Sequence, residues 1–378
     1  MSQVKGSWLA SAPAQAVCAL LEEAGHEAWF VGGCVRNALM GAHVTDIDIS
    51  TDARPQVVMA LAQARGIKAV PTGIDHGTVT LVLSGTPFEV TTFRRDIETD
   101  GRHATVRFAE SLEEDAARRD FTVNALYADR AGSVRDPVGG LSDLPDRRFR
   151  FIGSATARIR EDYLRILRFF RFFAWYGDTL DEEGLAACAA GADGLARLSV
   201  ERVTAEMIKL LSAPDPARAV ASMAQAGVLA RILPGAEARW LGPFVAHEAE
   251  GLRDPMARLA ALGGSHDALR LSKADARRLG FFAGSISSDA QAGELGYRHG
   301  RALALNALAL RAAMMERAPQ PDELFRAETG AKAQFPLSAS DLPDALQGAE
   351  IGAALRRLEA VWIARQFAPT KTELLEEL

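Results

Sequence analysis

Two aspartates one residue apart are the strongest chemical signal in this chain. Asp46 and Asp48 alternate with Ile47 and Ile49, a pattern that predicts a β-strand whose isoleucines face a core. Residues two apart in a strand point to the same face, so the carboxylates would lie about 7 Å apart. Neighbouring carboxylates repel each other unless a cation lies between them. The pair therefore predicts a divalent metal, and Mg²⁺ beside substrate phosphates is its usual setting.

A pair of glycines precedes the aspartates. The apolar segment 28–31 predicts a short buried strand that ends at Gly32 and Gly33, and residues 34–40 predict a short helix. Glycines let an anionic ligand approach the backbone, and the unpaired N–H groups at a helix start suit phosphate. A phosphate-binding turn followed by a metal-binding pair predicts chemistry on a nucleoside triphosphate.

Five blocks of sequence follow one another in order, at residues 30–36 with 46–48, 88–94, 100–102, 118–125 and 161–165. Together they resemble the class II tRNA nucleotidyltransferases, or CCA-adding enzymes, and their relatives, the bacterial poly(A) polymerases. The resemblance is strong over residues 28–176 and thinner toward the C-terminus. It implies an α/β (α+β) pol-β-like nucleotidyltransferase head followed by an all-helical C-terminal region, with Mg²⁺ as cofactor, tRNA as partner, and CTP and ATP as substrates.

By this resemblance, Asp46 and Asp48 bind two Mg²⁺ ions at the site of nucleotidyl transfer. A site of this type needs a third carboxylate on an adjacent strand. Glu89 is the candidate, since its neighbours Phe88 and Val90 point to the opposite face. A solvent-exposed strand face is the alternative explanation for these acidic residues.

The resemblance also assigns triphosphate contacts to Arg36 and Arg119, whose forked guanidinium donors suit phosphate oxygens. Arg119 is expected at the start of a helix over residues 119–127. A surface salt bridge is the alternative for either arginine. One departure is Asn37, where the family usually has Asp; an amide keeps the hydrogen bond to Arg36 but not the charge.

Asp162 and Arg165 are spaced to lie on one face of a predicted helix. An acceptor beside a donor matches the edges of cytosine and adenine, which pair an amine with a ring acceptor, and mismatches guanine and uracil. Such a pair would select C and A by about 1–3 kcal/mol. The alternative is an intrahelical salt bridge. Arg168 and Arg171 continue the spacing and are expected to contact phosphate or the RNA end.

Two further segments are predicted to contribute. Asp100 and Arg102 lie in a polar stretch that predicts a surface loop, and the resemblance implies that this loop reshapes the nucleotide pocket. A weaker expectation is a basic patch for the tRNA backbone in the C-terminal half, made of Arg270, Lys273, Arg277 and Arg278. A solvated helix face is the default explanation for such a run of charges.

The elements that must position these residues differ between the two halves of the chain. The first half mixes helical patterns near 13–24 and 111–127 with a predicted strand pair at 78–83 and 88–93. From Ile152 onward, alanine-rich helical periodicity replaces the strand patterns.

The length of 378 residues favours two or more domains. We expect a catalytic head over residues 1–150, a helical neck carrying the base-reading helix over 151–235, and a helical body and tail that bind tRNA over 236–378.

Composition limits the remaining possibilities. The net charge of −6 does not indicate nucleic-acid binding, so RNA contacts must come from local basic patches. The three cysteines form no Cys-x-x-Cys pair, which fits a reducing cytoplasm. The sequence predicts neither a signal peptide nor a membrane span, and it gives no sign of an obligate protein partner.

The leading functional hypothesis is template-independent addition of C, C and A to tRNA 3′ ends. A poly(A) polymerase is the first alternative, disfavoured because residues 71–78 lack the basic block typical of that branch. A CC-adding enzyme is disfavoured because the loop at 94–105 is not deleted. A catalytically inactive RNA-binding homologue is disfavoured because it would not need the carboxylate pair.

Overall fold

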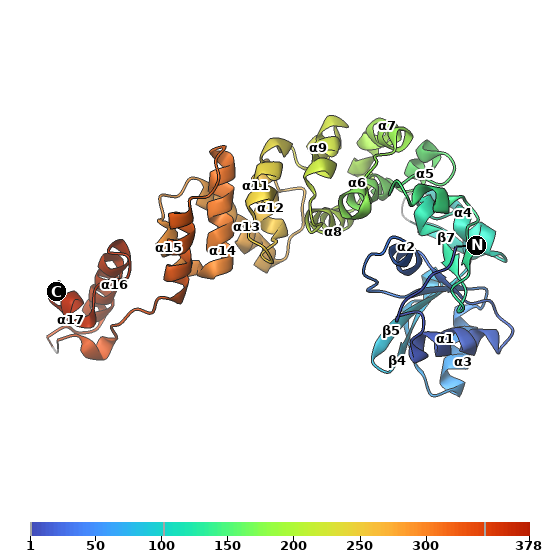
Figure 1. Ribbon diagram of the computed structural model, residues 1–378, viewed down its shortest axis with the longest axis horizontal. Helices are drawn as coiled ribbons and strands as arrows, with labels where there is room; N and C mark the ends of the chain where they lie inside the picture. The colour runs from blue at the N-terminus through green and yellow to red at the C-terminus, as the bar shows by residue number, and fades with distance from the viewer. Residues whose placement is uncertain (1, 101–102, 344) are drawn as a thin grey trace. The chain divides into compact units, whose positions relative to one another are not determined.

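The computed structural model describes residues 2–100, 103–343 and 345–378. The chain forms two compact units (Figure 1). The first contains the residues up to Glu206 together with Gln225–Arg231, and the second contains Met207–Ala224 and Ile232–Leu378.

The first unit is built on a mixed seven-stranded sheet of order β3-β4-β5-β2-β1-β8-β9. Its strands are β1 (Trp29–Val31), β2 (Asp48–Thr51), β3 (Lys68–Gly73), β4 (Thr78–Leu83), β5 (Thr86–Thr92), β8 (Tyr127–Ala128) and β9 (Val134–Arg135). Only the β2–β5 pair is parallel, and it lies at the centre of the sheet. The predicted strand pair at 78–83 and 88–93 is confirmed as the β4–β5 hairpin.

Alternation along the strands gives the sheet two buried faces. Phe30 belongs to a core shared with the helices α1 (Ala12–Glu22) and α3 (Pro55–Ala64), which lie side by side in Figure 1. The next residue, Val31, belongs to a second core with the helix α4 (Leu112–Ala117). Because successive strand residues point to opposite faces, the apolar run before the glycines is buried on both sides.

A separate two-stranded hairpin, made of β6 (Arg94–Asp100) and β7 (His103–Phe108), follows β5 directly. Arg94 pairs with Phe108 at its base, and the backbone N–H of Ala109 donates to Phe93 O at 2.8 Å. The hairpin therefore begins and ends beside the centre of the sheet.

The prediction of one helix near 111–127, with Arg119 at the start of a helix over 119–127, was wrong. The helix α4 ends at Ala117, a short 3₁₀ turn covers Thr122–Asn124, and Tyr127 is in β8. Phe121 adopts an extended backbone and bridges to Phe151. Burial of Phe121 among aromatic rings and pairing of Tyr127 in the sheet outweigh the weak helix propensity of this segment.

Helices follow the sheet in the remainder of the first unit. They include α5 (Ala155–Glu161), α6 (Leu164–Tyr176) and α7 (Glu182–Gly191), and α8 (Val200–Leu211) crosses the boundary between the units. The four phenylalanines of α6 are buried.

The described part of the second unit contains helices and no β-strand. Its longer helices are α9 (Ala217–Gln225), α12 (Pro255–Leu262), α13 (Lys273–Ile286), α14 (Ala292–Met314), α15 (Pro321–Lys332) and α16 (Ala349–Ala364); shorter ones are α11 (Leu241–His247) and α17 (Lys371–Leu375). The short helix α10 (Val228–Ile232) belongs to the first unit except for its last residue. The predicted class, a mixed α/β head followed by a helical region, is confirmed. No helix among the described residues is both long and apolar enough to cross a membrane.

One buried ion pair organises the start of this unit. Arg258 on α12 is fully buried and donates to both carboxylate oxygens of Glu248 and to the carbonyl oxygens of Leu211 and Pro214. A single guanidinium therefore satisfies orphan carbonyls at the end of α8 and a buried carboxylate together.

Candidate active site

A polar cavity of about 410 Å³ lies within the first unit. It opens over the centre of the sheet and is lined by Val31, Asp48, Ile49, Ser50, Thr78, Glu89, Thr91, Arg94, Arg118, Arg119, Asp120, Asp162, Leu164, Arg165, Arg168 and Arg202. Six of these residues are arginines and four are acidic, so the walls carry a formal surplus of positive charge. Such a lining suits a multiply charged anion.

Two carboxylates lie side by side at this cavity. Asp48 opens β2 and pairs in parallel register with Glu89 on β5, so the expectation of a carboxylate on an adjacent strand is confirmed. Burial and the nearby charge of Glu89 raise the pKa of Asp48 from 3.8 to about 6. The ionised form of Asp48 is therefore disfavoured until a positive charge balances it, which fits a cation site.

Asp46 occupies a different position from the one expected. The strand β2 begins at Asp48, so Asp46 precedes it, is exposed, and accepts a hydrogen bond from Thr45 Oγ1 at 3.0 Å. The prediction that both aspartates share a strand face was wrong in this respect. Within the described residues, no three acidic, histidine or cysteine side chains are gathered closely enough to hold a metal. Asp48 and Glu89 are thus the carboxylates that the sheet itself brings together.

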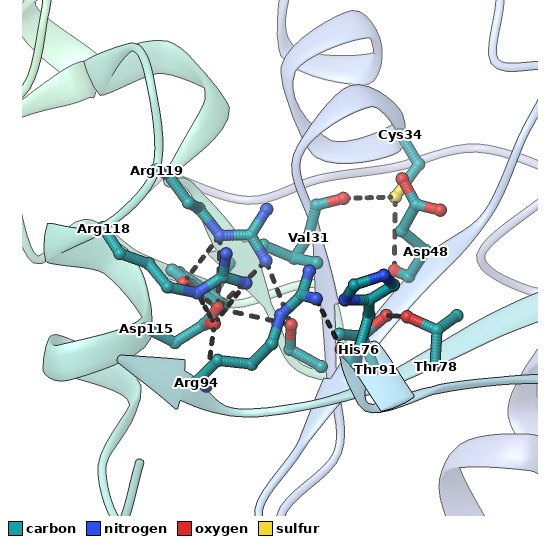
Figure 2. Close-up of polar contacts among 12 residues, drawn as sticks. Val31, Cys34, Asp48, His76, Thr78, Thr91, Arg94, Asp115, Arg118 and Arg119 are labelled. Atoms are coloured by element: carbon teal, nitrogen blue, oxygen red, sulfur yellow. Dashed lines mark hydrogen bonds and ion pairs between the residues drawn. The ribbon is translucent and has the colours of Figure 1, made fainter. Parts of the chain in front are cut away.

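The arginines at the cavity converge on a residue that sequence reasoning missed. Asp115 on α4 is fully buried and accepts hydrogen bonds from Arg118 Nε at 2.9 Å and from Arg119 Nη2 at 3.0 Å (Figure 2). Burial alone would raise the pKa of Asp115, but the guanidinium charges of Arg119 and Arg118 outweigh it and hold that pKa well below its ordinary value. The spacing of three and four residues between Asp115 and the two arginines was the signal that could have found it.

The glycine turn lies directly behind this cluster. Gly32 has φ +72°, a conformation that favours glycine, and a Cβ atom there would lie 3.5 Å from Arg119 Nη1. Neither Gly32 nor Gly33 is among the residues that line the cavity, whereas the preceding Val31 is. The positive φ of Gly32, rather than a lack of space beside Arg119, is therefore what favours glycine here, and contact of the turn with phosphate stays a prediction.

Arg36 is buried rather than exposed to the cavity. Its Nε and Nη2 donate to Asn37 Oδ1 at 3.1 and 2.8 Å, its Nη1 donates to Asn124 Oδ1, and its guanidinium lies 4.4 Å from the ring centroid of Tyr176. Asn37 thus keeps the expected hydrogen bond to Arg36 without the charge. Desolvation lowers the pKa of Arg36. Arg36 does not line the cavity, so its predicted triphosphate contact stays a prediction that this arrangement does not favour.

The structure changes the geometry expected of Asp162 and Arg165. They do not share one helix, because Asp162 has an extended backbone between α5 and α6 and only Arg165 lies in α6. The N–H of Leu164 donates to Asp162 Oδ1 at 3.0 Å, and Arg202 donates to Asp162 Oδ2 at 2.7 Å. The extended backbone of Asp162 is what lets its carboxylate bond to the start of α6.

Arg165 has partners other than Asp162. It donates to Glu161 Oε2 at 2.6 Å and to Arg118 O at 3.2 Å. The alternative of a salt bridge between Asp162 and Arg165 is thus not what this structure contains. Both side chains line the cavity, as base-reading groups would have to.

Arg168 and Arg171, the next two arginines of α6, have different surroundings. Arg168 lines the cavity and donates to Asp120 Oδ2 at 2.8 Å. Burial raises the pKa of Asp120, but the charge of Arg168 and hydrogen bonds lower it to about 2 overall. Arg171 pairs with Glu206 at 2.7 Å and is not part of the cavity lining. Of the two, Arg168 is placed to meet a ligand in the cavity.

The remaining expected residues lie elsewhere. Arg102 is outside the described residues, and for Asp100 the structure describes only the backbone, at the end of β6. In the second unit, Lys273 and Arg277 are exposed on α13, Arg278 pairs with Asp254 and Asp275, and Arg270 is exposed before that helix. Their role in RNA binding stays a prediction.

Two protein families and several curated relatives match parts of this chain. The poly(A) polymerase head-domain family matches residues 28–150, and a family described as a probable RNA- and SrmB-binding site of polymerase A matches residues 179–239. A CCA-adding enzyme of Geobacillus thermodenitrificans is 46% identical over 217 residues, 57% of this chain and 52% of the relative. The mitochondrial CCA tRNA nucleotidyltransferase 1 of Mus musculus is 42% identical over 197 residues, 51% of this chain and 45% of the relative. The matched region spans about half the length of these curated relatives.

Solved structures extend the similarity along the chain. The Bacillus stearothermophilus CCA-adding enzyme in complex with CTP is 32% identical, with a TM-score of 0.73 over 94% of this chain and 93% of that one. The Thermotoga maritima CCA-adding enzyme complexed with tRNA_CCA, at 18% identity and a TM-score of 0.72 over 100% of this chain and 98% of that one, shares the fold. This chain therefore belongs to the family of CCA-adding enzymes, which share the poly(A) polymerase head domain.

Proposed function

We propose that this chain adds C, C and A to tRNA 3′ ends from CTP and ATP, without a nucleic-acid template, by nucleotidyl transfer. The observation that carries the proposal is the pair Asp48 and Glu89, held on neighbouring parallel strands at the edge of an arginine-lined cavity. The similarity to a CCA-adding enzyme, to a CCA tRNA nucleotidyltransferase and to a CCA-adding enzyme in complex with CTP supports the choice of reaction.

Asp48 and Asp46 would hold Mg²⁺, with Glu89 completing the acidic edge. The raised pKa of Asp48 supports this assignment, because a carboxylate destabilised by burial and by Glu89 gains most from a bound cation. When bound, Mg²⁺ would lower the pKa of the attacking 3′-hydroxyl and stabilise the leaving pyrophosphate. Asp46 is exposed before the strand, so its carboxylate is accessible to an ion beside Asp48.

The arginines of the cavity would bind the triphosphate. Arg119 and Arg118 are oriented by Asp115, and Arg168 is oriented by Asp120, so each presents a guanidinium whose direction is already fixed. Fixed donors lose little conformational entropy on binding and make strong hydrogen bonds to phosphate oxygens.

Asp162 and Arg165 would read the incoming base. Asp162 accepts from the amine of C or A, and Arg165 donates to the ring nitrogen beside that amine. Arg202 is a partner of Asp162, to which it donates at 2.7 Å. We propose that a base carrying an amine displaces Arg202, whereas a carbonyl edge leaves Asp162 facing an acceptor.

We keep three further assignments as proposals. The chain divides functionally into a head over residues 1–150, a neck over 151–235 and a tRNA-binding body and tail over 236–378. Cys18, Cys34 and Cys188 are buried and form no disulfide, which fits action in the reducing cytoplasm. Poly(A) addition remains the alternative product, because poly(A) polymerases share the head domain.

The test compares three variants on a tRNA that lacks its CCA end. Asp48→Ala and Asp46→Ala should each lose Mg²⁺-dependent addition by at least about 10³-fold while remaining folded. Glu23→Gln, an exposed carboxylate paired with Arg65 outside the cavity, is the matched control and should retain activity. Addition by the Asp48→Ala protein at the control rate would contradict the proposal.

A further inference from the structure

One fully buried carboxylate connects the cavity arginines to a neighbouring element. Asp115 Oδ2 accepts from Arg119 Nη2 at 3.0 Å and from Tyr127 Oη at 2.8 Å, and Asp115 Oδ1 accepts from Arg118 Nε at 2.9 Å. Tyr127 Oη in turn accepts from Arg119 Nε at 3.0 Å. The carboxylate is therefore shared among several donors, none of which can strengthen its bond without weakening another.

The same carboxylate also accepts a backbone hydrogen bond. The N–H of Arg94 donates to Asp115 Oδ1 at 3.3 Å, and Arg94 is the first residue of β6 (Figure 2). The Arg94 guanidinium lines the cavity and donates to His76 O. Asp115 thus meets the β6–β7 hairpin at its base and the two adjacent arginines of the cavity at once.

We propose that Asp115 is a positioning residue that orients Arg118 and Arg119 for the triphosphate. When the triphosphate binds, Asp115 also transmits this change to the base of the β6–β7 hairpin through its hydrogen bond with the Arg94 N–H. This inference rests on the proposed function and deepens it. Phosphate oxygens that accept from Arg118 and Arg119 weaken the bonds of these arginines to Asp115. The carboxylate then bonds more strongly to its remaining donors, among them the Arg94 N–H. Such coupling is reciprocal, so the state of the hairpin base must also affect nucleotide affinity.

A purely structural role for Asp115 makes a different prediction. Asp143 is a second fully buried carboxylate of the same unit, and it accepts from Arg148 and Arg150 away from the cavity. If Asp115 served only stability, Asp115→Asn and Asp143→Asn would act alike. Asp143→Asn is therefore the matched control.

The experiment measures KM and kcat for CTP and ATP, and hydrogen–deuterium exchange at the Arg94 amide with and without CTP in the absence of tRNA. In the wild-type protein, CTP should slow exchange at this amide. In Asp115→Asn, both KM values should rise by about tenfold with a smaller change in kcat, and saturating CTP should no longer slow exchange at Arg94. Tyr127→Phe removes the donor to Asp115 and the acceptor for Arg119 Nε but keeps the carboxylate, and it should raise KM by about threefold. It decides the question if Asp115→Asn does not fold.

Two results would overturn the inference. One is a KM that stays unchanged in folded Asp115→Asn or, if Asp115→Asn does not fold, a KM that stays unchanged in Tyr127→Phe. The other is Arg94 exchange that responds to CTP in the variant as it does in the wild type. Asp143→Asn should keep the wild-type KM and exchange response, and a loss equal to that of Asp115→Asn would reduce Asp115 to a stabilising role. Because exchange is measured without tRNA, absence of CCA addition with an intact CTP response would contradict the proposed function alone.

Discussion

Asp48→Asn should make the metal-free protein more stable, although it removes a residue at the centre of the proposed site. The folded protein holds the ionised Asp48 half-buried beside Glu89, and both conditions disfavour the charge. An amide of nearly the same shape removes that charge and keeps most of the packing. The substitution therefore tests how much the ionised Asp48 carboxylate destabilises the folded protein, independently of its proposed role in nucleotidyl transfer.

The size of the effect follows from the pKa of Asp48. A rise from 3.8 to about 6 corresponds to about 3 kcal/mol at 1.36 kcal/mol per pKa unit, and partial solvent screening of this half-buried group reduces it to about 1–2 kcal/mol. Because the raised pKa favours the protonated form in the folded state, the penalty is absent below pH 3.8, grows as pH rises to about 6, and is constant above it. For a unit of about 200 residues, the gain in Tm at pH 8 is about 3–6 °C.

The assay is thermal unfolding in EDTA at pH 8 and pH 4.5. Asp48→Asn should unfold at a higher temperature than the wild type at pH 8, and the difference should shrink at pH 4.5. Asp46→Asn, at an exposed position, is the control and should change stability by less than about 0.5 kcal/mol. Adding Mg²⁺ should raise the Tm of the wild type more than that of Asp48→Asn. Equal or lower stability of Asp48→Asn at pH 8 would refute the reasoning.

Three further predictions concern other parts of the chain. Asp162→Ala should lose preference for CTP and ATP over UTP and GTP by about 5- to 150-fold in single-nucleotide incorporation, and unchanged selectivity would exclude base reading by this residue. The double variant Lys273→Ala/Arg277→Ala should reduce the slope of log Kd for tRNA against log salt concentration by about 2, as expected if each residue neutralises one phosphate, and an unchanged slope would exclude them from the interface. Arg258→Ala should lower the free energy of unfolding by about 3–5 kcal/mol in urea titrations because it leaves Glu248 buried without its partner, and a loss under 1 kcal/mol would contradict the structural role of this pair.

Local alternation and the family resemblance together predicted where Glu89 lies. Alternation put Glu89 on the strand face opposite Phe88 and Val90, the resemblance supplied the need for a third carboxylate, and the parallel β2–β5 register places Glu89 beside Asp48.

Features that depend on distant partners were not predicted. The spacing of Asp115 to Arg118 and Arg119 was a local signal, but its links to Tyr127 on β8 and to Arg94 at the start of β6 exist only in the folded sheet. The break between α5 and α6 at Asp162 was missed because the residue spacing fits an unbroken helix equally well. Burial of Arg36 depends on Tyr176 from the end of α6, a contact that no local pattern encodes.

Stepwise incorporation on defined tRNA ends is the most direct test of the central claim. The protein is incubated with Mg²⁺ and each nucleoside triphosphate separately, on tRNA ending before the CCA sequence, after the first C and after CC. We expect two additions from CTP alone on the first substrate, one from CTP on the second, one from ATP on the third, and no extension of the completed end. Repeated addition of A to any of these ends, or no addition to any of them, would contradict the assignment of this chain as a CCA-adding enzyme.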